Sequence, residues 1–144
     1  MNDQTLIAVV DDDPMWLATA GRMLSRDGYH VLLIGDPMKA TSQISKERPA
    51  VVVLDLAMPG LNGVELARAL LLELGEAAPP MVLISGDLSD LSRDEGALFE
   101  AAYEKPVSLK QLLSEVRRLV RGQKISGTLS RDDVMSAGRG EETG

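Results

Sequence analysis

The sequence predicts a doubly wound α/β domain, in which helices cover both faces of a parallel β-sheet. Short aliphatic runs alternate with amphipathic segments five times along the chain. The first four runs are apolar throughout, which is typical of strands buried on both faces. Repeated alternation of strand and helix favours parallel strands joined by right-handed crossovers. We find no internal repeat beyond this alternation.

The first half of the chain supplies three predicted strands and two helices. Asp13-Pro14 and Asp36-Pro37 each predict a helix start, with aspartate as the cap and proline at the first helical position. We expect Gly28 to end the first helix and Pro49 to close the second. The three predicted strands span residues 6–10, 31–34 and 51–54.

A third helix is predicted to begin at Asn62, which with Glu65 fits a capping box. Pro79-Pro80 then breaks the chain before a fourth strand over residues 81–84. The predicted buried stripe of the third helix consists of Val64, Ala67, Leu71 and Leu74.

The last third of the chain contains the weakest helix candidate, residues 88–99, which has few apolar residues. A short fifth strand is predicted over residues 101–104. Ser108 with Gln111 fits a capping box for the last helix, and we expect Gly122 to end it. The apolar residues expected to be buried by this helix are Leu109, Leu112, Leu113, Val116 and Val120.

Length and composition limit the possible classes of protein. The 144 residues suit one domain, and the net charge of −7 disfavours direct binding to nucleic-acid phosphates. The absence of cysteine excludes disulfides and thiolate sites, and His30 alone cannot form a multi-histidine metal site. No apolar run approaches the roughly 20 residues that span a bilayer, and the N-terminus has no basic leader, so we expect a cytoplasmic protein without membrane insertion.

We predict one domain over residues 1–122, followed by a polar, flexible tail over residues 123–144. The tail is rich in glycine, serine, arginine and aspartate and has few large apolar side chains. Such a segment cannot bury enough apolar surface to form a second domain. A short docking segment is the alternative interpretation of this tail.

Polar residues follow the predicted strands. Asp11 and Asp12 follow the first strand, Asp55 the third, Ser85 the fourth and Lys105 the fifth. The carboxyl ends of parallel strands lie at one edge of the sheet, where ligands bind at the point of strand-order reversal. If the first and third strands are neighbours there, the three carboxylates converge.

Three converging carboxylates require a cation. At about 4 Å each like-charged pair costs roughly 4 kcal/mol at an effective dielectric constant of 20. Oxygen ligands without histidine or cysteine select a hard ion, and a site shared with phosphate suits Mg²⁺. Lys105 would supply a second positive charge, Ser85 a hydroxyl donor, and an aspartate could itself be the nucleophile.

Each residue alone has an ordinary structural explanation. Asp13 fits a helix cap because Pro14 follows it, Asp55 would serve as a strand end, and Lys105-Pro106 as a surface turn. Together, fitting residue types follow four of the five strands, so coincidence is the poorer explanation.

These motifs resemble the receiver domain of two-component response regulators. The resemblance covers residues 6–122, and its most specific stretch is Asp55-Leu56-Ala57-Met58-Pro59-Gly60-Leu61-Asn62-Gly63. Val9-Val10-Asp11-Asp12, Ser85-Gly86 and Lys105-Pro106 strengthen it. The resemblance implies a flavodoxin-like (βα)5 fold, a five-stranded parallel sheet of order 2-1-3-4-5.

The resemblance also implies a set of site roles. Asp55 would be the phosphoacceptor, with Ser85 and Lys105 contacting the phosphoryl group. The Lys105-Pro106 peptide bond is expected to be cis. The implied Mg²⁺ ligands are Asp12, Asp55 and the backbone carbonyl of Ala57, with Asp11 acting through water.

The chain departs from the family pattern near its readout elements. Ser85-Gly86 stands where Thr-Ala or Ser-Ala is usual, and the segment from Ser85 to Lys105 is about two residues short. The aromatic residue that commonly reports the switch stands three places before the lysine, where this chain has Ala102, while Tyr103 falls on the opposite side of the strand. Readout is therefore expected to depend on movement of the weak fourth helix.

The predicted function is a stand-alone phospho-accepting switch, not an enzyme acting on other substrates. It would take phosphate from a sensor histidine kinase or phosphotransfer protein, and then control a protein partner or relay the phosphate. One alternative is a phosphatase with an aspartate nucleophile, whose paired aspartates separated by one residue match Asp11 and Asp13. The other is a pseudo-receiver that never carries phosphate.

Overall fold

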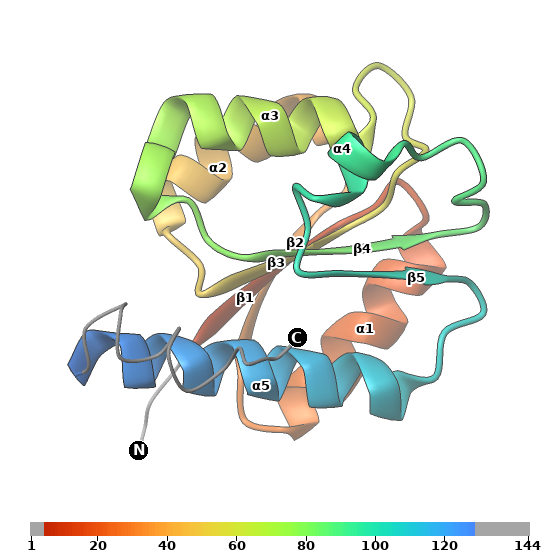
Figure 1. Cartoon of the computed structure of the whole chain (residues 1–144). Coiled ribbons are helices and arrows are strands. Elements are labelled where there is room, and N and C mark those ends of the chain that lie inside the picture. The colour runs from red at the N-terminus through yellow and green to blue at the C-terminus, as the bar shows by residue number, and fades with distance from the viewer. Residues whose placement is uncertain (1–4, 129–144) are drawn as a thin grey trace.

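The computed structural model describes residues 5–128, with side chains up to residue 122. Within this range, five parallel strands form one sheet in the order β2-β1-β3-β4-β5 (Figure 1). The predicted doubly wound fold and its strand order are confirmed. The strands are β1 (Leu6–Val10), β2 (His30–Ile34), β3 (Val51–Leu54), β4 (Met81–Ser85) and β5 (Ala101–Glu104).

Helices cover both faces of this sheet. Figure 1 shows α2, α3 and α4 on one face and α1 and α5 on the other. The longer helices are α1 (Pro14–Arg26), α2 (Ala40–Glu47), α3 (Gly63–Leu74) and α5 (Leu109–Thr128). The short ones are α4 (Arg93–Gly96) and the 3₁₀ turns η1 (Pro37–Lys39) and η2 (Gly75–Ala77).

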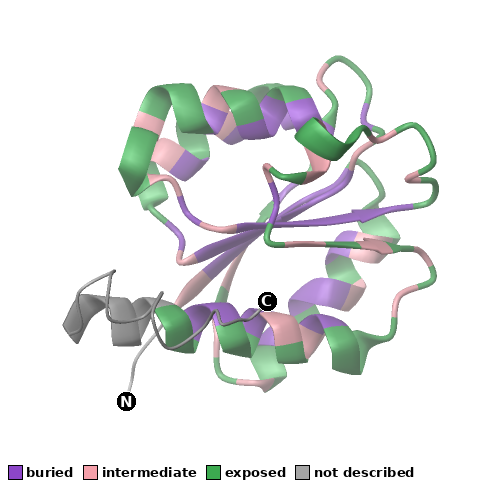
Figure 2. Ribbon diagram, viewed as in Figure 1, coloured by how far each residue is buried: buried purple, intermediate pink, exposed green. Residues whose placement is uncertain are grey.

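The sheet separates two apolar clusters, one under each helical layer. Along β1, Ala8 and Val10 belong to the cluster under α2 and α3, whereas Ile7 and Val9 belong to the cluster under α1 and α5. Successive side chains of a strand point to opposite faces, so a strand covered on both sides must be apolar at every position. Figure 2 shows this burial along the central strands.

The predicted helix starts hold for α1 and α3 and differ for the second helix. Asp13 caps α1, and Asn62 with Glu65 forms the predicted capping box of α3. The side chain of Asp36 instead caps η1, accepting the backbone N–H of Met38, so α2 begins only at Ala40. The Asp-Pro pair here starts a 3₁₀ turn that leads into the helix.

The predicted buried face of α3 is partly wrong. Val64 and Ala67 are buried as expected, whereas Leu71 is 38% exposed. The other residues buried by α3 are Gly63, Leu66 and Leu70. Gly63, Leu66, Ala67 and Leu70 follow helical spacing of three and four residues, which places the buried face one position earlier than predicted.

The last helix extends beyond its predicted end. Ser108 accepts the backbone N–H of Gln111 as expected, but α5 continues through Gly122 to Thr128. Leu119 and Val120 are both buried, which anchors the helix up to this glycine, and a mid-helix glycine costs only about 1 kcal/mol. Leu109 is 38% exposed, so its predicted burial is wrong. Residues 129–144 of the predicted tail lie outside the described residues.

The segment between β4 and β5 contains only one helical turn, α4, in place of a helix over residues 88–99. Ser92 and Glu95 form a capping box at its start. At its end, the N–H groups of Leu98 and Phe99 bond to carbonyls three residues back, which is the 3₁₀ pattern that terminates a helix. Across residues 5–128, no helix is long and apolar enough to cross a membrane.

Candidate metal and phosphoryl site

The central strands hold two of the predicted acidic residues at one edge of the sheet. β1 and β3 are neighbours, with Val10 opposite Leu54, so the residues that follow them are adjacent. The backbone N–H of Asp55 donates to the Val10 carbonyl at 3.1 Å. That of Asp11 donates to the Ile34 carbonyl of β2, also at 3.1 Å. Both aspartates are therefore fixed by the hydrogen-bond ladder of the sheet.

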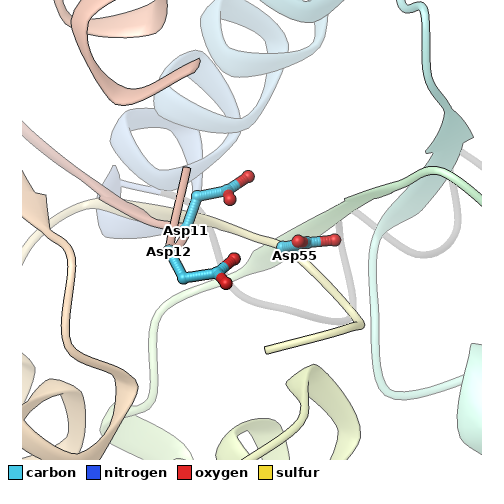
Figure 3. A group of neighbouring side chains, drawn as sticks. All are labelled: Asp11, Asp12 and Asp55. Atoms are coloured by element: carbon cyan, nitrogen blue, oxygen red, sulfur yellow. The ribbon is translucent and has the colours of Figure 1, made fainter. Parts of the chain in front are cut away.

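The structure brings together the three predicted carboxylates. Asp11, Asp12 and Asp55 each offer one oxygen, and these oxygens lie within 4.8 Å of one another. Figure 3 shows the three side chains side by side at the strand ends. Asp11 is 1% exposed and Asp55 7% exposed, whereas Asp12 is open to solvent. Two of the three charges are thus poorly hydrated and close to a third.

Lys105 is the cation that the structure places in this cluster. Its Nζ lies 3.1 Å from Oδ2 of Asp11 and 3.9 Å from Oδ2 of Asp55. Its backbone N–H donates to the Ser85 carbonyl at 2.7 Å, which ties it to the end of β4. The Lys105-Pro106 peptide bond is cis, as predicted. Three carboxylates and one ammonium leave a formal charge of −2.

The pKa of the Asp11 carboxyl shows that ionising this buried group is unfavourable. Burial raises the pKa of the Asp11 carboxyl above its ordinary value, and the neighbouring Asp55 charge raises it further. Hydrogen bonds from the Asp13 backbone N–H, at 2.9 Å, and from Lys105 act in the opposite direction. Burial is the largest of these effects, so the ionised carboxylate is unfavourable without further positive charge.

Gly63 allows the loop after β3 to lie directly on the start of α3. A Cβ atom at this position would stand 2.4 Å from the Asp55 carbonyl oxygen and 3.0 Å from the Leu56 Cα. The Gly63 N–H donates to the Leu56 carbonyl at 2.8 Å. Met58, only 7% exposed, packs into the core beneath the same loop. The position of Asp55 therefore depends on a glycine.

Two other predicted site residues lie at this edge. Ser85 is 1% exposed at the carboxyl end of β4, the strand next to β3. Ala57 is exposed in the loop after β3, and its N–H donates to Oδ1 of Asp55 at 3.4 Å.

Sequence reasoning assigned no role to two residues that the structure places at the site. Gly63 belongs to the motif over residues 55–63 and directly follows the helix cap Asn62, where the absence of a Cβ allows the loop to lie close. The ring centroid of Trp16 lies 5.6 Å from the Lys105 Nζ. Nothing in the spacing of Trp16 and Lys105 along the chain predicts this contact.

The donor set fits a hard divalent cation. The three clustered groups are all carboxylates, and the formal charge of −2 is the charge that one divalent ion neutralises. Mg²⁺ in proteins is held by one or two carboxylates together with water and phosphate oxygens. The residues present therefore suit Mg²⁺ at this sheet edge.

A doubly wound fold with clustered acids after β1 and β3 and a lysine after β5 defines a receiver-type signalling domain. Residues 7–117 match the response regulator receiver domain, and the chain belongs to this family. Members of the family are phospho-accepting switches of two-component systems that bind Mg²⁺ at an acidic site and receive phosphate from histidine kinases.

Similar proteins include the response regulator MprA of Mycobacterium ulcerans, 36% identical over 129 residues, which are 89% of this chain and 55% of that protein. MprA of Mycobacterium avium is 37% identical over 119 residues, 82% of this chain and 52% of that protein. The chain thus spans about half the length of these relatives.

Solved structures of low identity share the fold. The receiver domain of the Francisella response regulator 1452 matches with a TM-score of 0.76 at 23% identity, covering 83% of this chain and 99% of that chain. TrrA of Thermotoga maritima, in complex with Mg²⁺-BeF, matches with a TM-score of 0.73 at 22% identity, covering 81% and 99%.

Proposed function

We propose that this chain accepts a phosphoryl group on Asp55 in a Mg²⁺-dependent reaction and then changes conformation. The observation that supports this most strongly is the convergence of Asp11, Asp12, Asp55 and Lys105 at one sheet edge. Asp55 lies within reach of both the acidic pair and the ammonium. It is therefore the carboxylate around which the other charges are arranged.

The proposed Mg²⁺ ligands are Asp12, Asp55 and the backbone carbonyl of Ala57, with Asp11 acting through water. The bound ion would neutralise charge on the incoming phosphoryl group. Asp12, exposed at the rim, is the carboxylate that an entering ion meets first. TrrA, which shares this fold, has been solved in complex with Mg²⁺-BeF, which supports Mg²⁺ as the proposed ion.

In the proposed transfer, a carboxylate oxygen of Asp55 attacks phosphorus and forms an acyl phosphate. The bond between phosphorus and the donor atom breaks, and its electron pair leaves with the donor. Lys105 would move its ammonium from the Asp carboxylates to the phosphoryl oxygens, and the Ser85 hydroxyl would donate to another of them. Such transfer depends mainly on positioning and charge stabilisation.

The proposed donor is a sensor histidine kinase or a phosphotransfer protein. The phosphorylated chain would control a downstream protein partner or relay the phosphate, and would catalyse only its own phosphorylation and dephosphorylation. The absence of direct contact with nucleic acid stays a prediction, supported by the net charge of −7. The division into a receiver domain and a polar tail also stays a prediction.

The phosphatase alternative loses its support in the position of Asp13. The side chain of Asp13 caps α1 by accepting the Met15 N–H at 3.0 Å, so it serves the helix and not the acidic cluster. The complete acidic set with Lys105 likewise disfavours a pseudo-receiver. Neither alternative has an observation of its own in its favour.

Readout is proposed to use the segment around α4 and not an aromatic rotamer switch. Ala102 is exposed where the usual aromatic would stand. Tyr103 is half-buried, packs against the cluster under α1 and α5, and donates its hydroxyl to Glu115 at 3.2 Å. The aromatic ring is thus held on the α5 face of the sheet, away from α4.

The test is phosphorylation by a small-molecule phosphodonor with Mg²⁺, followed by intact-protein mass. We expect one phosphoryl adduct that is labile to base, and its loss in Asp55→Asn or in the presence of a chelator. The matched control Asp94→Asn removes an exposed carboxylate of α4 and should retain the adduct. An adduct that persists in Asp55→Asn would contradict the proposal.

A further inference from the structure

The indole ring of Trp16 lies close to the Lys105 ammonium. It occupies the first turn of α1, is half-buried, and packs at the margin of the cluster between α1, α5 and the sheet. The Lys105 Nζ lies over its ring, 5.6 Å from the ring centroid. An ammonium within about 6 Å of an indole face is attracted by the negative electrostatic potential that the ring quadrupole creates there.

The Lys105 side chain is flexible, so its position depends on the groups that contact its ammonium. It is a flexible four-carbon stem with a strongly hydrated ammonium, and 28% of it is exposed. Two carboxylates compete for it, with Asp11 at 3.1 Å and Asp55 at 3.9 Å. The backbone bond to Ser85 fixes only the base of the side chain. The indole face of Trp16 is a further contact of the ammonium, beside these two carboxylates.

We propose that Trp16 is a positioning residue whose indole face holds the Lys105 ammonium between Asp11 and Asp55, ready to pair with a phosphoryl group. This role rests on the proposed function of Asp55 as phosphoacceptor. The ring excludes water from one side of the ammonium and attracts it at the same time. It acts only through Lys105 and does not touch the reacting atoms.

A purely structural role for Trp16 makes a different prediction. As a space-filling side chain at the margin of the core, it would affect stability whether or not Lys105 is present. As a positioning residue, it affects phosphorylation only while the ammonium is there to be positioned. A double-mutant cycle between Trp16 and Lys105 separates the two roles.

The experiment measures the phosphorylation rate constant with a small phosphodonor at saturating Mg²⁺. Trp16→Leu should slow phosphorylation about fivefold, equivalent to about 1 kcal/mol, and Trp16→Phe, which keeps a weaker ring face, about twofold. In a Lys105→Met background, Trp16→Leu should have no further effect. Equal slowing in both backgrounds, or no slowing in either, overturns the proposal.

A second measurement covers the case in which Lys105→Met reacts too slowly to follow. The affinity for beryllofluoride, a phosphoryl mimic, should fall with Trp16→Leu in the wild-type background alone. The Mg²⁺ affinity measured by calorimetry should stay within about twofold, because Trp16 acts on the ammonium and not on the acids. A loss of beryllofluoride affinity independent of Lys105 also overturns the proposal.

Two controls separate the possible failures. Met23→Ala truncates another half-buried residue of α1 that packs on the same cluster, and it should lower stability without changing the rate constant at a temperature where it is folded. Failure of the wild-type protein to form any adduct would contradict the proposed function itself. A normal wild-type adduct with no Trp16 effect would contradict only the positioning role.

Discussion

The acidic edge at β1 and β3 and the segment from β4 through α4 to β5 are held in place very differently. Every residue of β3 is buried, whereas β5 alternates between half-buried and exposed residues. Beside them, α3 has 12 residues of which five are buried, while α4 has four residues and none is buried (Figure 2). The α4 segment is anchored mainly by Leu88, Leu91, Leu98 and Phe99.

This difference in burial predicts that the acidic edge and the α4 segment differ in mobility. Burial of apolar surface sets most of the free energy needed to displace a segment, so we expect the edge that carries Asp55 to be rigid and the α4 segment to shift at low cost. The start of that segment is also tied to β5 by an exposed hydrogen bond, from the Leu88 N–H to Glu104 at 3.1 Å. We therefore expect Asp55 to stay fixed while the segment around α4 moves.

The largest effect is expected from Gly63→Ala. The new Cβ would stand 2.4 Å from the Asp55 carbonyl oxygen, a backbone atom that cannot move without displacing Asp55. We expect the free energy of unfolding to fall by about 3 kcal/mol, with weaker Mg²⁺ binding. Urea denaturation and calorimetry measure the two effects.

Gly122→Ala is the matched control, because nothing lies within 4 Å of its added Cβ in α5. It should stabilise the protein by about 0.5–1 kcal/mol through helix propensity. Equal effects of the two substitutions would show that the acidic edge is as adaptable as the surface of α5.

Asp11→Asn, measured without Mg²⁺, is expected to raise the stability of the protein, by less than Gly63→Ala lowers it. The folded protein holds the Asp11 proton more tightly than the unfolded chain, so wild-type stability falls as pH rises from the ordinary pKa of 3.8 through the raised value. The variant lacks this decline and should be about 1 kcal/mol more stable than wild type at pH 7. The gain is no larger because the loss of pairing with Lys105 partly offsets the relief of repulsion.

Urea unfolding in the presence of a chelator, at several pH values between about 3.5 and 7, measures this difference. The stability gap should grow with pH and then level off. Asp94→Asn, which removes an exposed carboxylate, is measured beside it as the control for loss of one negative charge. A variant less stable than wild type at pH 7 would contradict the account of Asp11 as a buried, costly charge.

The smallest effect on global stability is expected from removing Ser92, the residue that caps α4. Asn62→Ala and Ser92→Ala each remove the side chain that caps a helix, α3 and α4 respectively. Loss of such a cap costs about 1 kcal/mol. We expect Asn62→Ala to lower global stability by this amount, whereas Ser92→Ala should open only the α4 segment and leave the urea midpoint nearly unchanged.

Amide hydrogen exchange distinguishes the two cases residue by residue. Ser92→Ala should speed exchange over residues 93–99 alone, and Asn62→Ala should lower protection throughout the sheet. If both variants shift the urea midpoint equally, the α4 segment is not an independently mobile part of the fold.

The fold and the acidic cluster follow from the sequence because their signals are local. An apolar run that stops at Asp11 or Asp55 marks both a buried strand and its carboxyl end, and strand topology then brings the two acids together. The capping pair Asn62 and Glu65 is equally local.

Other features depended on tertiary packing. The exposure of Leu71 is set by how α3 sits on the sheet, and the continuation of α5 past Gly122 follows from buried Leu119 and Val120. The contact of Trp16 with Lys105 joins residues far apart in the chain. Such features have no local signature.

The central claim is that phosphate is carried by Asp55, and chemical mapping of the adduct tests it most directly. After phosphorylation by a small phosphodonor with Mg²⁺, borohydride reduces an acyl phosphate to an alcohol, which marks the modified aspartate in peptide mass spectra. The account predicts reduction at Asp55 alone, absent without the phosphodonor. Reduction at Asp11 or Asp12, or at no aspartate of a protein shown to carry phosphate, would contradict it.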